Sequence, residues 1–585
     1  MSVSSIFDEY NLPKLLGKDQ EKITISPVQE KIEISFSCRN LRIPEQDAPI
    51  SSQIKVSVEN DGQKRFVGET EIAKKTANPK FTGTFSSDYY FEIRQDLSID
   101  VMVIRRQTWE LLGSVTTTLA AIVGQMNKAA EFDIQKDGQV FGKLIIESEK
   151  SVGSNSVAHL QFHGRKLKNM NGWLNKNNPF FKMYKTQAAE QDTLVYESEI
   201  LKKESSPDWQ PCEVFLHALC NNDTSHPIKV EVFSQNKAKD RNKLIGECKF
   251  TIDDLKSQHE LDLPLAKPQK PKKIRGVLQI RDFHIKEKPG FLDYLKGGLQ
   301  VKPIFAVDFT SSNKEYTNSN SLHVIRKAGG LNPYQKVINS LCEIILNYNF
   351  DKNAALLGFG GKPLGHAHTS HAFSLNGQED NPWVPTTPNI LETYKKAVYE
   401  VTLGGPTCFE HILRKTMKIA KASKDQGSTT YYLLFILTDG LIHDMEQTLN
   451  CLVEAAKLPL SVIIVGIGDA DLKKLDVFNG EGDLYNSAGD KVDRKLHQFY
   501  SFGRFGNEEE LLQTVLKDIP KQVATYMDKM NIEPLQKDSI EKITNTKVMQ
   551  DITNQTNNEG SMTLGLGLGK SDYSSLPVLD QENRI

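Results

Sequence analysis

The sequence predicts a multidomain protein with two all-β sandwiches followed by an α/β doubly wound domain. In the first half, apolar and polar residues alternate along short segments, as in strands with one buried face. Several short segments between residues 36 and 142 have matching segments, in the same order, between residues 162 and 276. Past residue 291, near-continuous apolar runs alternate with amphipathic segments, which is typical of parallel strands connected by helices.

The composition is that of an ordinary globular chain. With 585 residues, 38% of them hydrophobic and 25% charged, the chain can form three or four domains. A net charge of −2 excludes a globally basic nucleic-acid-binding protein. No apolar run reaches the roughly 20 residues that a membrane-spanning helix needs. The seven cysteines are scattered and form no C-x-x-C pair, and the first residues lack a secretion signal, so we expect a reduced, cytosolic protein.

The first half of the chain contains two copies of one module. The segment FSCRNLR (36–42) matches FHGRKLK (162–168), and ETEIAKK (69–75) matches ESEILKK (197–203). The matching segments occur in the same order in both copies, and the difference in residue number between them grows slowly along the chain. This pattern indicates a duplicated domain with loop insertions in the second copy. We place an extension at 1–25 and the two sandwiches at 26–150 and 154–287.

Both modules resemble C2 domains. The resemblance rests on the repeated E-[TS]-E-I-x-K-K segment and on an L-[LI]-G element late in each module, at Leu111 and Leu244. It implies an eight-stranded sandwich whose loops at one end commonly hold Ca²⁺ and contact phospholipid. Calcium requires six to eight hard oxygen ligands, so members that bind it carry a cluster of acids in these loops.

Neither module has that cluster of acids. Asn and Ser offer an oxygen without a charge, and Lys repels a cation, so we expect weak or no calcium dependence. The positions that have lost their acids are Ser52 in the first module and Asn171, Asn178, Ser234, Asn236 and Lys243 in the second.

A basic surface on the second module could still bind lipid or a protein partner. Lysines close to an anionic leaflet contribute on the order of 1 kcal/mol each. The alternative is that they are solvated charges that protect the edge of a sheet. The candidates, expected on neighbouring strands, are Lys182, Lys185, Lys202 and Lys203.

The third domain, residues 291–530, has the pattern of a doubly wound fold. Apolar runs at 303–309, 431–440 and 458–468 are expected to form buried parallel strands. Between the first two, apolar side chains recur at helical spacing from Val337 to Tyr348. Ligands of such folds bind at the carboxyl ends of the strands.

Acids and hydroxyls gather at those strand ends. Asp308, Thr310 and Ser312 form a D-x-T-x-S motif directly after one strand, Asp439 ends another, and Thr407 lies on a third loop. Two carboxylates and three hydroxyls, with water, suit a small, hard, octahedral cation such as Mg²⁺ or Mn²⁺. The sequence therefore predicts a metal site.

Residues 291–530 are similar to the von Willebrand factor A-type domain of the copines, through FLDYLKGG, AVDFTSSN, LGFG, GGPT, LTDG and KDIPKQV. Two C2 domains followed by this domain is the copine architecture. The resemblance implies that the five residues form a metal-ion-dependent adhesion site, where a partner's carboxylate completes the Mg²⁺ shell. It also implies calcium-regulated phospholipid binding and recruitment of target proteins.

The predicted function is that of a cytosolic, non-enzymatic adaptor for membrane trafficking. It would dock on anionic phospholipid and recruit protein partners through the metal site; nucleic acid is not an expected partner. The alternative is a calcium-independent structural protein associated with the cytoskeleton. No nucleophile elbow or phosphate-binding loop is present, and the histidines of GHAHTSHAF lack further zinc ligands. Residues 531–585 are expected to be a flexible tail.

Overall fold

The computed structural model describes most of the chain between residues 30 and 536. The predicted tail and the extension at 1–25 lie almost entirely outside the described residues. The segments within the described range that are left out are 43–49, 61–62, 106, 152–154, 171–175, 187–191, 236–241, 259, 327–328, 469–472, 480–483 and 505–506.

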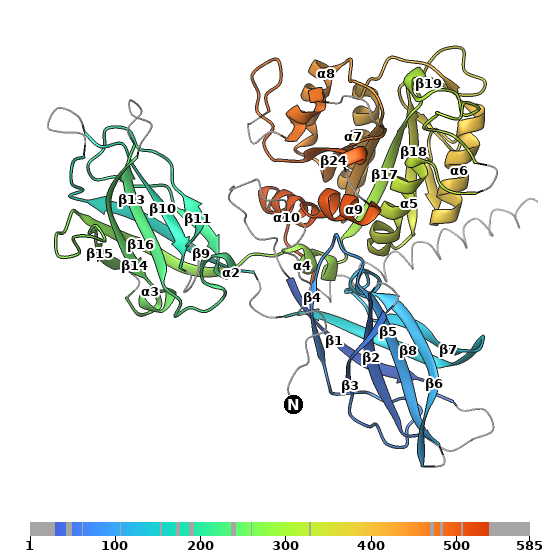
Figure 1. Cartoon of the computed structure of the whole chain (residues 1–585), viewed down its shortest axis with the longest axis horizontal. Helices are drawn as coiled ribbons and strands as arrows, with labels where there is room; N and C mark the ends of the chain where they lie inside the picture. Colours follow the sequence, from blue (N-terminus) through green and yellow to red (C-terminus); the bar gives the residue numbers. More distant parts are fainter. Residues whose placement is uncertain are drawn as a thin grey trace, which may run out of the picture. The chain divides into compact units, whose positions relative to one another are not determined.

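The described residues form two β-sandwiches and one α/β domain, which confirms the predicted fold class (Figure 1). No described helix is both long enough and apolar enough to cross a membrane.

The described residues of the first sandwich form eight strands and one short helix. Its strands follow the order β3-β2-β5-β6-β7-β8-β1-β4, and a single Ser114–Gln135 pair joins β6 to β7. Alternate side chains of β1 are buried, as the period-2 pattern predicted. The elements are β1 (Glu30–Arg39), β2 (Ser52–Asn60), β3 (Gln63–Glu69), β4 (Phe85–Tyr89), β5 (Asp96–Arg105), β6 (Thr108–Thr118), α1 (Leu119–Val123), β7 (Ala130–Lys136) and β8 (Gln139–Lys150).

The second sandwich repeats this order in two four-stranded sheets, β11-β10-β13-β14 and β12-β9-β16-β15. Its elements are β9 (Ser156–Arg165), β10 (Pro179–Lys185), β11 (Thr193–Glu197), β12 (Cys212–Phe215), α2 (Leu216–Cys220), β13 (Ile228–Ser234), β14 (Lys243–Phe250), α3 (Ile252–Gln258), β15 (Leu261–Pro264) and β16 (Val277–Glu287).

The duplication extends to details of the backbone and its hydrogen bonds. Gly142 and Gly276 occupy the same unusual backbone conformation, with φ of 143° and 141°. A hydroxyl in each module accepts a backbone N–H from a neighbouring strand: Thr70 accepts from Ile54 at 3.0 Å. Its counterpart Ser198 accepts from Phe181 at 2.9 Å. The same fold is therefore present twice, with the same glycine conformation and the same hydroxyl hydrogen bond in each copy.

The repeated E-[TS]-E-I-x-K-K segment is not a strand along its whole length. The strands end at Glu69 and Glu197, the first residue of each copy, and an irregular segment follows. Lys75 and Lys203 have left-handed backbones, with φ of 47° and 55°, which interrupts a strand. Lys202 and Lys203 therefore lie on a turn after β11 rather than on a strand, which corrects the placement expected for them.

The α/β domain is built on a mainly parallel sheet, with the strand order β20-β18-β17-β23-β24-β25. Its helices are α4 (Phe291–Lys296), α5 (Pro333–Ile345), α6 (Thr387–Glu400), α7 (Glu410–Asp425), α8 (Met445–Ala455), α9 (Glu508–Leu516) and α10 (Ile519–Lys529). Its strands are β17 (Gln300–Asp308), β18 (Asn353–Phe359), β19 (Gly361–Lys362), β20 (Phe373–Ser374), β21 (Trp383–Pro385), β22 (Thr402–Leu403), β23 (Thr430–Thr438), β24 (Leu460–Gly466) and β25 (His497–Ser501).

Helices cover both faces of this sheet. Side chains of α5, α6, α9 and α10 belong to one buried hydrophobic cluster, together with alternate residues of β17 such as Phe305 and Val307. Side chains of α7 and α8 belong to a second cluster, with Ile304 and Ala306 from the other face of the same strand. Burial on both faces explains why these strands are continuous apolar runs in the sequence.

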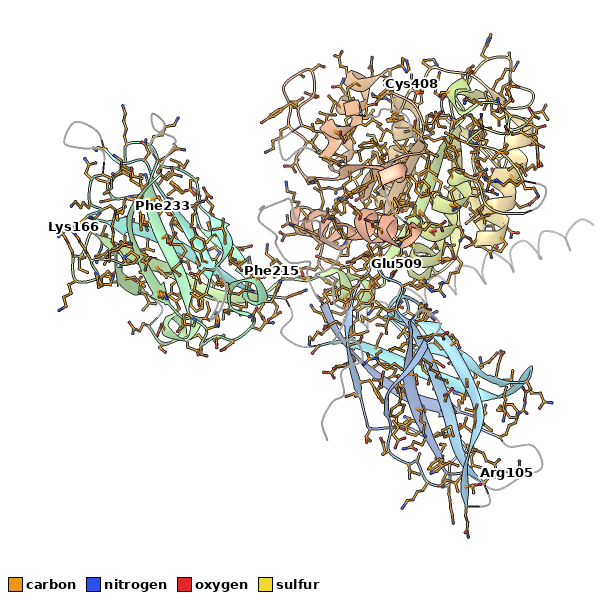
Figure 2. The ribbon with its side chains drawn as sticks, viewed as in Figure 1. Arg105, Lys166, Phe215, Phe233, Cys408 and Glu509 are labelled. Carbon is orange, nitrogen blue, oxygen red and sulfur yellow. The ribbon has the colours of Figure 1, made fainter. Side chains whose placement is uncertain are left out.

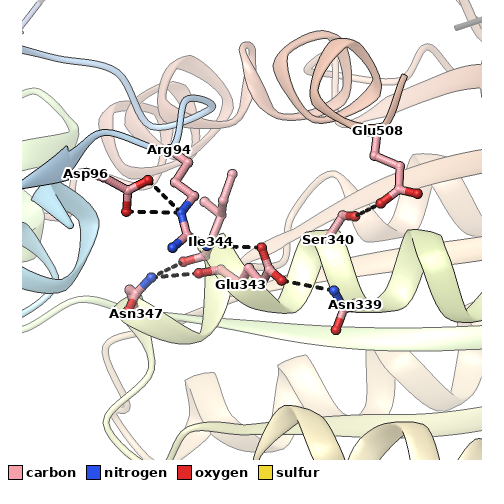
Figure 3. A network of polar contacts seen from close by, with 8 residues as sticks. All are labelled: Arg94, Asp96, Asn339, Ser340, Glu343, Ile344, Asn347 and Glu508. Carbon is pink, nitrogen blue, oxygen red and sulfur yellow. Dashed lines mark hydrogen bonds and ion pairs between the residues drawn. The ribbon is translucent and has the colours of Figure 1, made fainter. Parts of the chain in front are cut away.

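The first sandwich shares a buried cluster with the α/β domain, whereas the second sandwich has a cluster of its own. Phe91 of the first sandwich packs on Phe291 and Tyr348, with ring centroids 5.2 and 4.8 Å apart. The Tyr89 and Tyr348 hydroxyls are hydrogen-bonded to each other. Arg94 adds a polar contact, since its guanidinium pairs with Glu343 of α5 at 3.3 Å (Figure 3).

Candidate metal site of the α/β domain

The predicted metal-binding residues lie where the connections of the sheet diverge. The chain leaves β17 and reaches β18 on one side, and later returns to β23 on the other side. β17 ends at Asp308, and β23 ends at Thr438, directly before Asp439. The two strands are parallel neighbours, with Val307 opposite Leu437. Both carboxylates therefore reach the carboxyl edge of the sheet at the topological switch point, the usual ligand position in such folds.

The loop after β17 carries the two hydroxyls of the D-x-T-x-S motif. The Thr310 backbone N–H donates to Asp308 Oδ1 at 2.8 Å, which folds the loop back over the end of the strand. The Thr310 and Ser312 hydroxyl oxygens are 3.0 Å apart. The Ser312 hydroxyl donates to Asp439 Oδ1 at 2.8 Å, so hydrogen bonds connect four of the five predicted residues.

Thr407, the fifth predicted residue, reaches the same edge from the loop before α7. Its side chain is buried, and its hydroxyl lies beside Gly440, which follows Asp439. A Cβ at Gly440 would be 2.7 Å from Thr407 Oγ1, so this approach requires glycine. The neighbouring Cys408 marks this loop in Figure 2.

Three residues that the sequence analysis did not single out support the site. Thr438 donates its hydroxyl to Asp308 Oδ2 at 2.5 Å. Asn313 donates its side-chain amide to Asp439 Oδ1 at 2.9 Å. His323 is buried, and its Nε2 lies 2.9 Å from the backbone oxygen of Asp308. Thr438 and Asn313 adjoin the predicted motifs and could have been found there, whereas nothing in the sequence pointed to His323.

The two carboxylates lie in an environment that disfavours their negative charges. Burial raises the pKa of Asp308, although hydrogen bonds from Thr438 and Thr310 oppose the change. Burial, together with the nearby Asp308 carboxylate, raises the pKa of Asp439 to about 7. Burial also lowers the pKa of His323 to about 4, so this ring is neutral at neutral pH and supplies no positive charge.

This donor set fits a divalent cation. No lysine or arginine within the described ranges acts on either carboxylate, so two acids share a buried site without a protein counter-charge. Two carboxylates and three hydroxyls are hard oxygen donors, which suit Mg²⁺ or Mn²⁺. The residues that would hold the ion are Asp308, Thr310, Ser312, Thr407 and Asp439.

Among the described positions that lack calcium-binding acids, Asn178, Ser234 and Lys243 have other partners. Ser52 is buried at the start of β2, and its hydroxyl has no hydrogen-bond partner among the described residues. The Asn178 backbone N–H donates to the hydroxyl of Ser234 at 3.3 Å. The Lys243 ammonium donates to the backbone oxygen of Met170 at 2.9 Å, so a positive charge lies beside Met170. Asn171 and Asn236 lie outside the described residues.

The candidate lysine surface of the second sandwich divides into two parts. Lys182 and Lys185 lie on β10, where Lys182 is paired with Glu197 at 2.9 Å and Lys185 donates to Asn221 at 3.0 Å. Lys202 and Lys203 are exposed on the turn after β11. Part of the expected positive charge is therefore neutralised within the sandwich. At one end of the first sandwich, Arg105 lies at the tip of the β5–β6 hairpin (Figure 2).

The fold and the site define an architecture of tandem C2 domains joined to a von Willebrand factor A-like domain. The C2 family model matches residues 33–134 and 160–265, and the copine family model matches residues 321–535. The chain is 31% identical over 539 residues to the protein BONZAI 2 of Arabidopsis thaliana, which covers 86% of this chain and 91% of that protein. The chain belongs to the copine family, and this membership fits a membrane-associated adaptor.

Solved structures with weaker similarity also contain C2 domains. A structure described as BON1-C2B is 19% identical, covers 23% of this chain and 94% of its own, and has a TM-score of 0.21. The calcium-bound tandem C2 domains of extended synaptotagmin 2 are 16% identical, cover 45% of this chain and 100% of their own, and have a TM-score of 0.20. Family membership rests on the family models and on the Arabidopsis relative rather than on these structures.

Proposed function

We propose that this copine is a cytosolic, non-enzymatic adaptor that docks on phospholipid surfaces and recruits a protein partner through Mg²⁺. The observation that carries the proposal is the pair of buried carboxylates, Asp308 and Asp439, at the edge of the α/β sheet beside three hydroxyls. A binding role accounts for this arrangement without any nucleophile or general base.

The carboxylates favour an ion that remains accessible to a partner. Asp308 and Asp439 repel each other, and a bound divalent cation offsets that repulsion. When bound, the ion supplies a positive charge and an open coordination position that a partner's carboxylate can fill. Thr310, Ser312 and Thr407 would orient the ion, while Thr438 and Asn313 fix the carboxylates by hydrogen bonds.

The C2 domains supply the membrane contact in this proposal, with little or no dependence on calcium. In the second sandwich, the ammonium of Lys243 donates to the backbone oxygen of Met170. A fixed positive charge there opposes Ca²⁺ but attracts anionic headgroups, as do the exposed Lys202 and Lys203.

Partner capture tests the metal-dependent half. Protein with Asp439→Asn keeps the shape of the side chain but removes one charge. We expect the wild type to retain its partners in Mg²⁺ and to release them in EDTA, whereas D439N retains none in either condition. The exposed Asp380 provides a matched control, since D380N should behave like the wild type. Equal retention by D439N and the wild type would contradict a metal-bridged adaptor.

Liposome sedimentation tests the membrane half. Vesicles containing phosphatidylserine and phosphoinositide should sediment the protein equally well with Ca²⁺ and with EGTA, and less well at high salt. Failure to bind under every condition would reject membrane docking. Binding that requires Ca²⁺ would reject the proposed calcium independence alone.

The second candidate function is a calcium-independent structural protein on the cytoskeleton. The absence of acids at the described loop positions of both C2 domains favours it, because a protein without lipid docking has no need of them. Co-sedimentation with filaments that is unchanged by D439N, together with no binding to vesicles, would favour this candidate.

A further inference from the structure

Two histidines and an aspartate lie close together on the second sandwich, outside the sites discussed so far. His159 belongs to β9, and Asp282 and His284 belong to β16. One potential metal-binding atom from each of the three side chains lies within 4.8 Å of the other two.

The sheet brings these side chains together in a row across three strands. His284 is directly opposite His159 in the register of β16 and β9. Glu213 of β12 is opposite His159 on the other side. The two imidazole rings stack, with centroids 4.4 Å apart and planes 20° apart. The row therefore depends on the register of the sheet and not on a loop conformation.

A β-bulge adds Asp282 to the row. The register of β16 shifts between Arg281 and His284, and Asp282 adopts a left-handed backbone with φ of 48°. This conformation is uncommon for a residue other than glycine, although Asp tolerates it better than most. Bulges typically redirect a side chain, and this one turns the Asp282 carboxylate toward both histidines.

The distances suit a single small cation. Asp282 Oδ2 lies 3.5 Å from His159 Nε2, and Asp282 Oδ1 lies 3.6 Å from His284 Nδ1. Two ligands of a tetrahedral zinc ion, each about 2.0–2.1 Å from the metal, are about 3.4 Å apart. The stacked imidazole rings would have to rotate about χ2 to point both nitrogens at one ion, and each Asp282–histidine distance is already close to that separation.

Glu213 occupies the position of an orienting carboxylate. Its Oε1 lies 3.7 Å from Nδ1 of His159, the ring nitrogen that does not face Asp282. Histidines that bind metals commonly donate their second N–H to a carboxylate, which fixes the tautomer. The ammoniums of Lys286 and Lys288 are both paired with Glu213, so this carboxylate offsets two positive charges that follow His284 in the chain.

We propose that the second sandwich binds a Zn²⁺ ion through His159, Asp282 and His284, with Glu213 orienting His159 and a fourth position open to water. Two imidazoles and one carboxylate suit a transition-metal ion better than Mg²⁺ or Ca²⁺, which prefer oxygen ligands alone. This zinc site is separate from the candidate metal site of the α/β domain, and it shares no residue with that site.

Zinc titration of the full chain tests the proposal, with millimolar Mg²⁺ present to occupy the α/β site. We expect the wild type to bind one equivalent of Zn²⁺ that is lost, or bound at least about tenfold more weakly, in His284→Ala and in Asp282→Asn. Both side chains are at least half exposed, so these variants should fold. His163→Ala is the matched control on the same strand as His159, and its Zn²⁺ binding should equal that of the wild type.

Cobalt substitution identifies the ligands directly. Co²⁺ in the wild type should give visible absorption of a nitrogen- and oxygen-ligated site, and both variants should lose it. A wild type that takes up no Zn²⁺ at micromolar concentration would overturn the proposal. The same holds for variants that bind Zn²⁺ like the wild type, and for a cobalt spectrum with thiolate charge-transfer bands, which would assign the ion to cysteines.

Discussion

At the candidate metal site, hydrogen bonds from neighbouring residues position two carboxylates that repel each other. The Ser312 hydroxyl and the Asn313 amide both donate to the same oxygen of Asp439. Thr310 and Thr438 donate to different oxygens of Asp308. Because each donor stabilises a charged carboxylate, the arrangement is prepared for a cation before the cation binds.

Substituting Asp439 should therefore remove the stabilisation that Mg²⁺ provides. At a concentration about 100 times the dissociation constant, a ligand stabilises the folded state by about 2.7 kcal/mol. We expect Mg²⁺ to raise the melting temperature of the wild type and to leave that of Asp439→Asn unchanged. In EDTA, D439N should melt at or above the wild-type temperature, because it lacks one of two repelling charges. A Mg²⁺-dependent rise in D439N equal to that of the wild type would contradict this prediction.

The sequence predicted the residues that gather at this candidate site because each one adjoins a strand end or a recognisable loop. It could not predict His323, which stacks on Phe309 with ring centroids 5.1 Å apart and lies against the backbone of Asp308. His323 is 15 residues from Asp308 along the chain, and only the folding of the intervening segment brings the two together.

Glu30 is another buried acid, at the contact between the first sandwich and α4. Its carboxylate accepts the Leu292 backbone N–H at 3.3 Å, close to Lys150 and Asp293. Burial raises the pKa of Glu30 to about 7; the Lys150 charge opposes this rise and the Asp293 charge adds to it. The protonated form is therefore favoured in the folded protein relative to the unfolded chain.

A raised pKa in the folded state makes stability fall as the pH rises. The contribution of Glu30, on the order of 3 kcal/mol, should be fully present below about pH 4.5 and lost as the pH rises through about 7. Glu30→Gln keeps the hydrogen-bond acceptor without the charge, so its free energy of unfolding should depend less on pH over this window. Denaturant titrations at several pH values measure the difference. Glu33→Gln, on an exposed position of the same strand, should retain the wild-type profile.

At the scale of the elements, one buried arginine connects several parts of the α/β sheet. Arg494 donates to the backbone oxygens of Ala456 at 2.9 Å and Leu458 at 2.8 Å. It also donates to Leu460, the first residue of β24, and to the Tyr431 hydroxyl on β23. The end of α8 and the starts of two strands thus depend on a single side chain.

Replacing Arg494 with methionine should destabilise this region strongly. Several backbone oxygens would lose their donor, and each buried group left without a partner costs about 1–3 kcal/mol. We expect Arg494→Met to reduce the free energy of unfolding by at least about 3 kcal/mol in denaturant titration. Lys495→Met removes the same charge from the neighbouring exposed position and should change stability by less than about 0.5 kcal/mol. Similar values for the two variants would contradict the role given to Arg494.

Regular elements were predictable, whereas local departures from them were not. The period-2 pattern of β1 and the apolar run of β23 were visible in the sequence because burial imposes them. The bulge at Asp282 and the left-handed turn at Lys203 follow from backbone geometry, and neither carries a glycine or proline that would have marked it.

At the scale of the whole chain, the two sandwiches differ in their relation to the α/β domain. The first shares a hydrophobic cluster with it, through residues such as Phe91, Phe291 and Tyr348. The second has a separate cluster that includes Phe162 and Trp209. No pattern in the sequence distinguished the two copies in this respect, because the contacts join segments far apart in the chain.

This difference should be visible in thermal unfolding. We expect calorimetry to resolve two transitions, one for the second sandwich and one for the first sandwich together with the α/β domain. Phe91→Ala should cost about 3–5 kcal/mol and shift the larger transition, and Phe162→Ala should shift the smaller one. Three separate transitions, or a shift of the smaller one by Phe91→Ala, would contradict the shared core.

The hydroxyl pair of Tyr89 and Tyr348 joins residues 259 positions apart, and the second sandwich lies between them in the chain. At a translation rate of about 5–20 residues per second, Tyr348 leaves the ribosome ~13–50 s after Tyr89. During that interval Tyr89 and Phe91 of the first sandwich lack their contacts with Tyr348. The second sandwich, which has its own hydrophobic cluster, can complete its fold in the same time. Of the three domains, the one synthesised first is thus the one whose apolar contact surface is completed last.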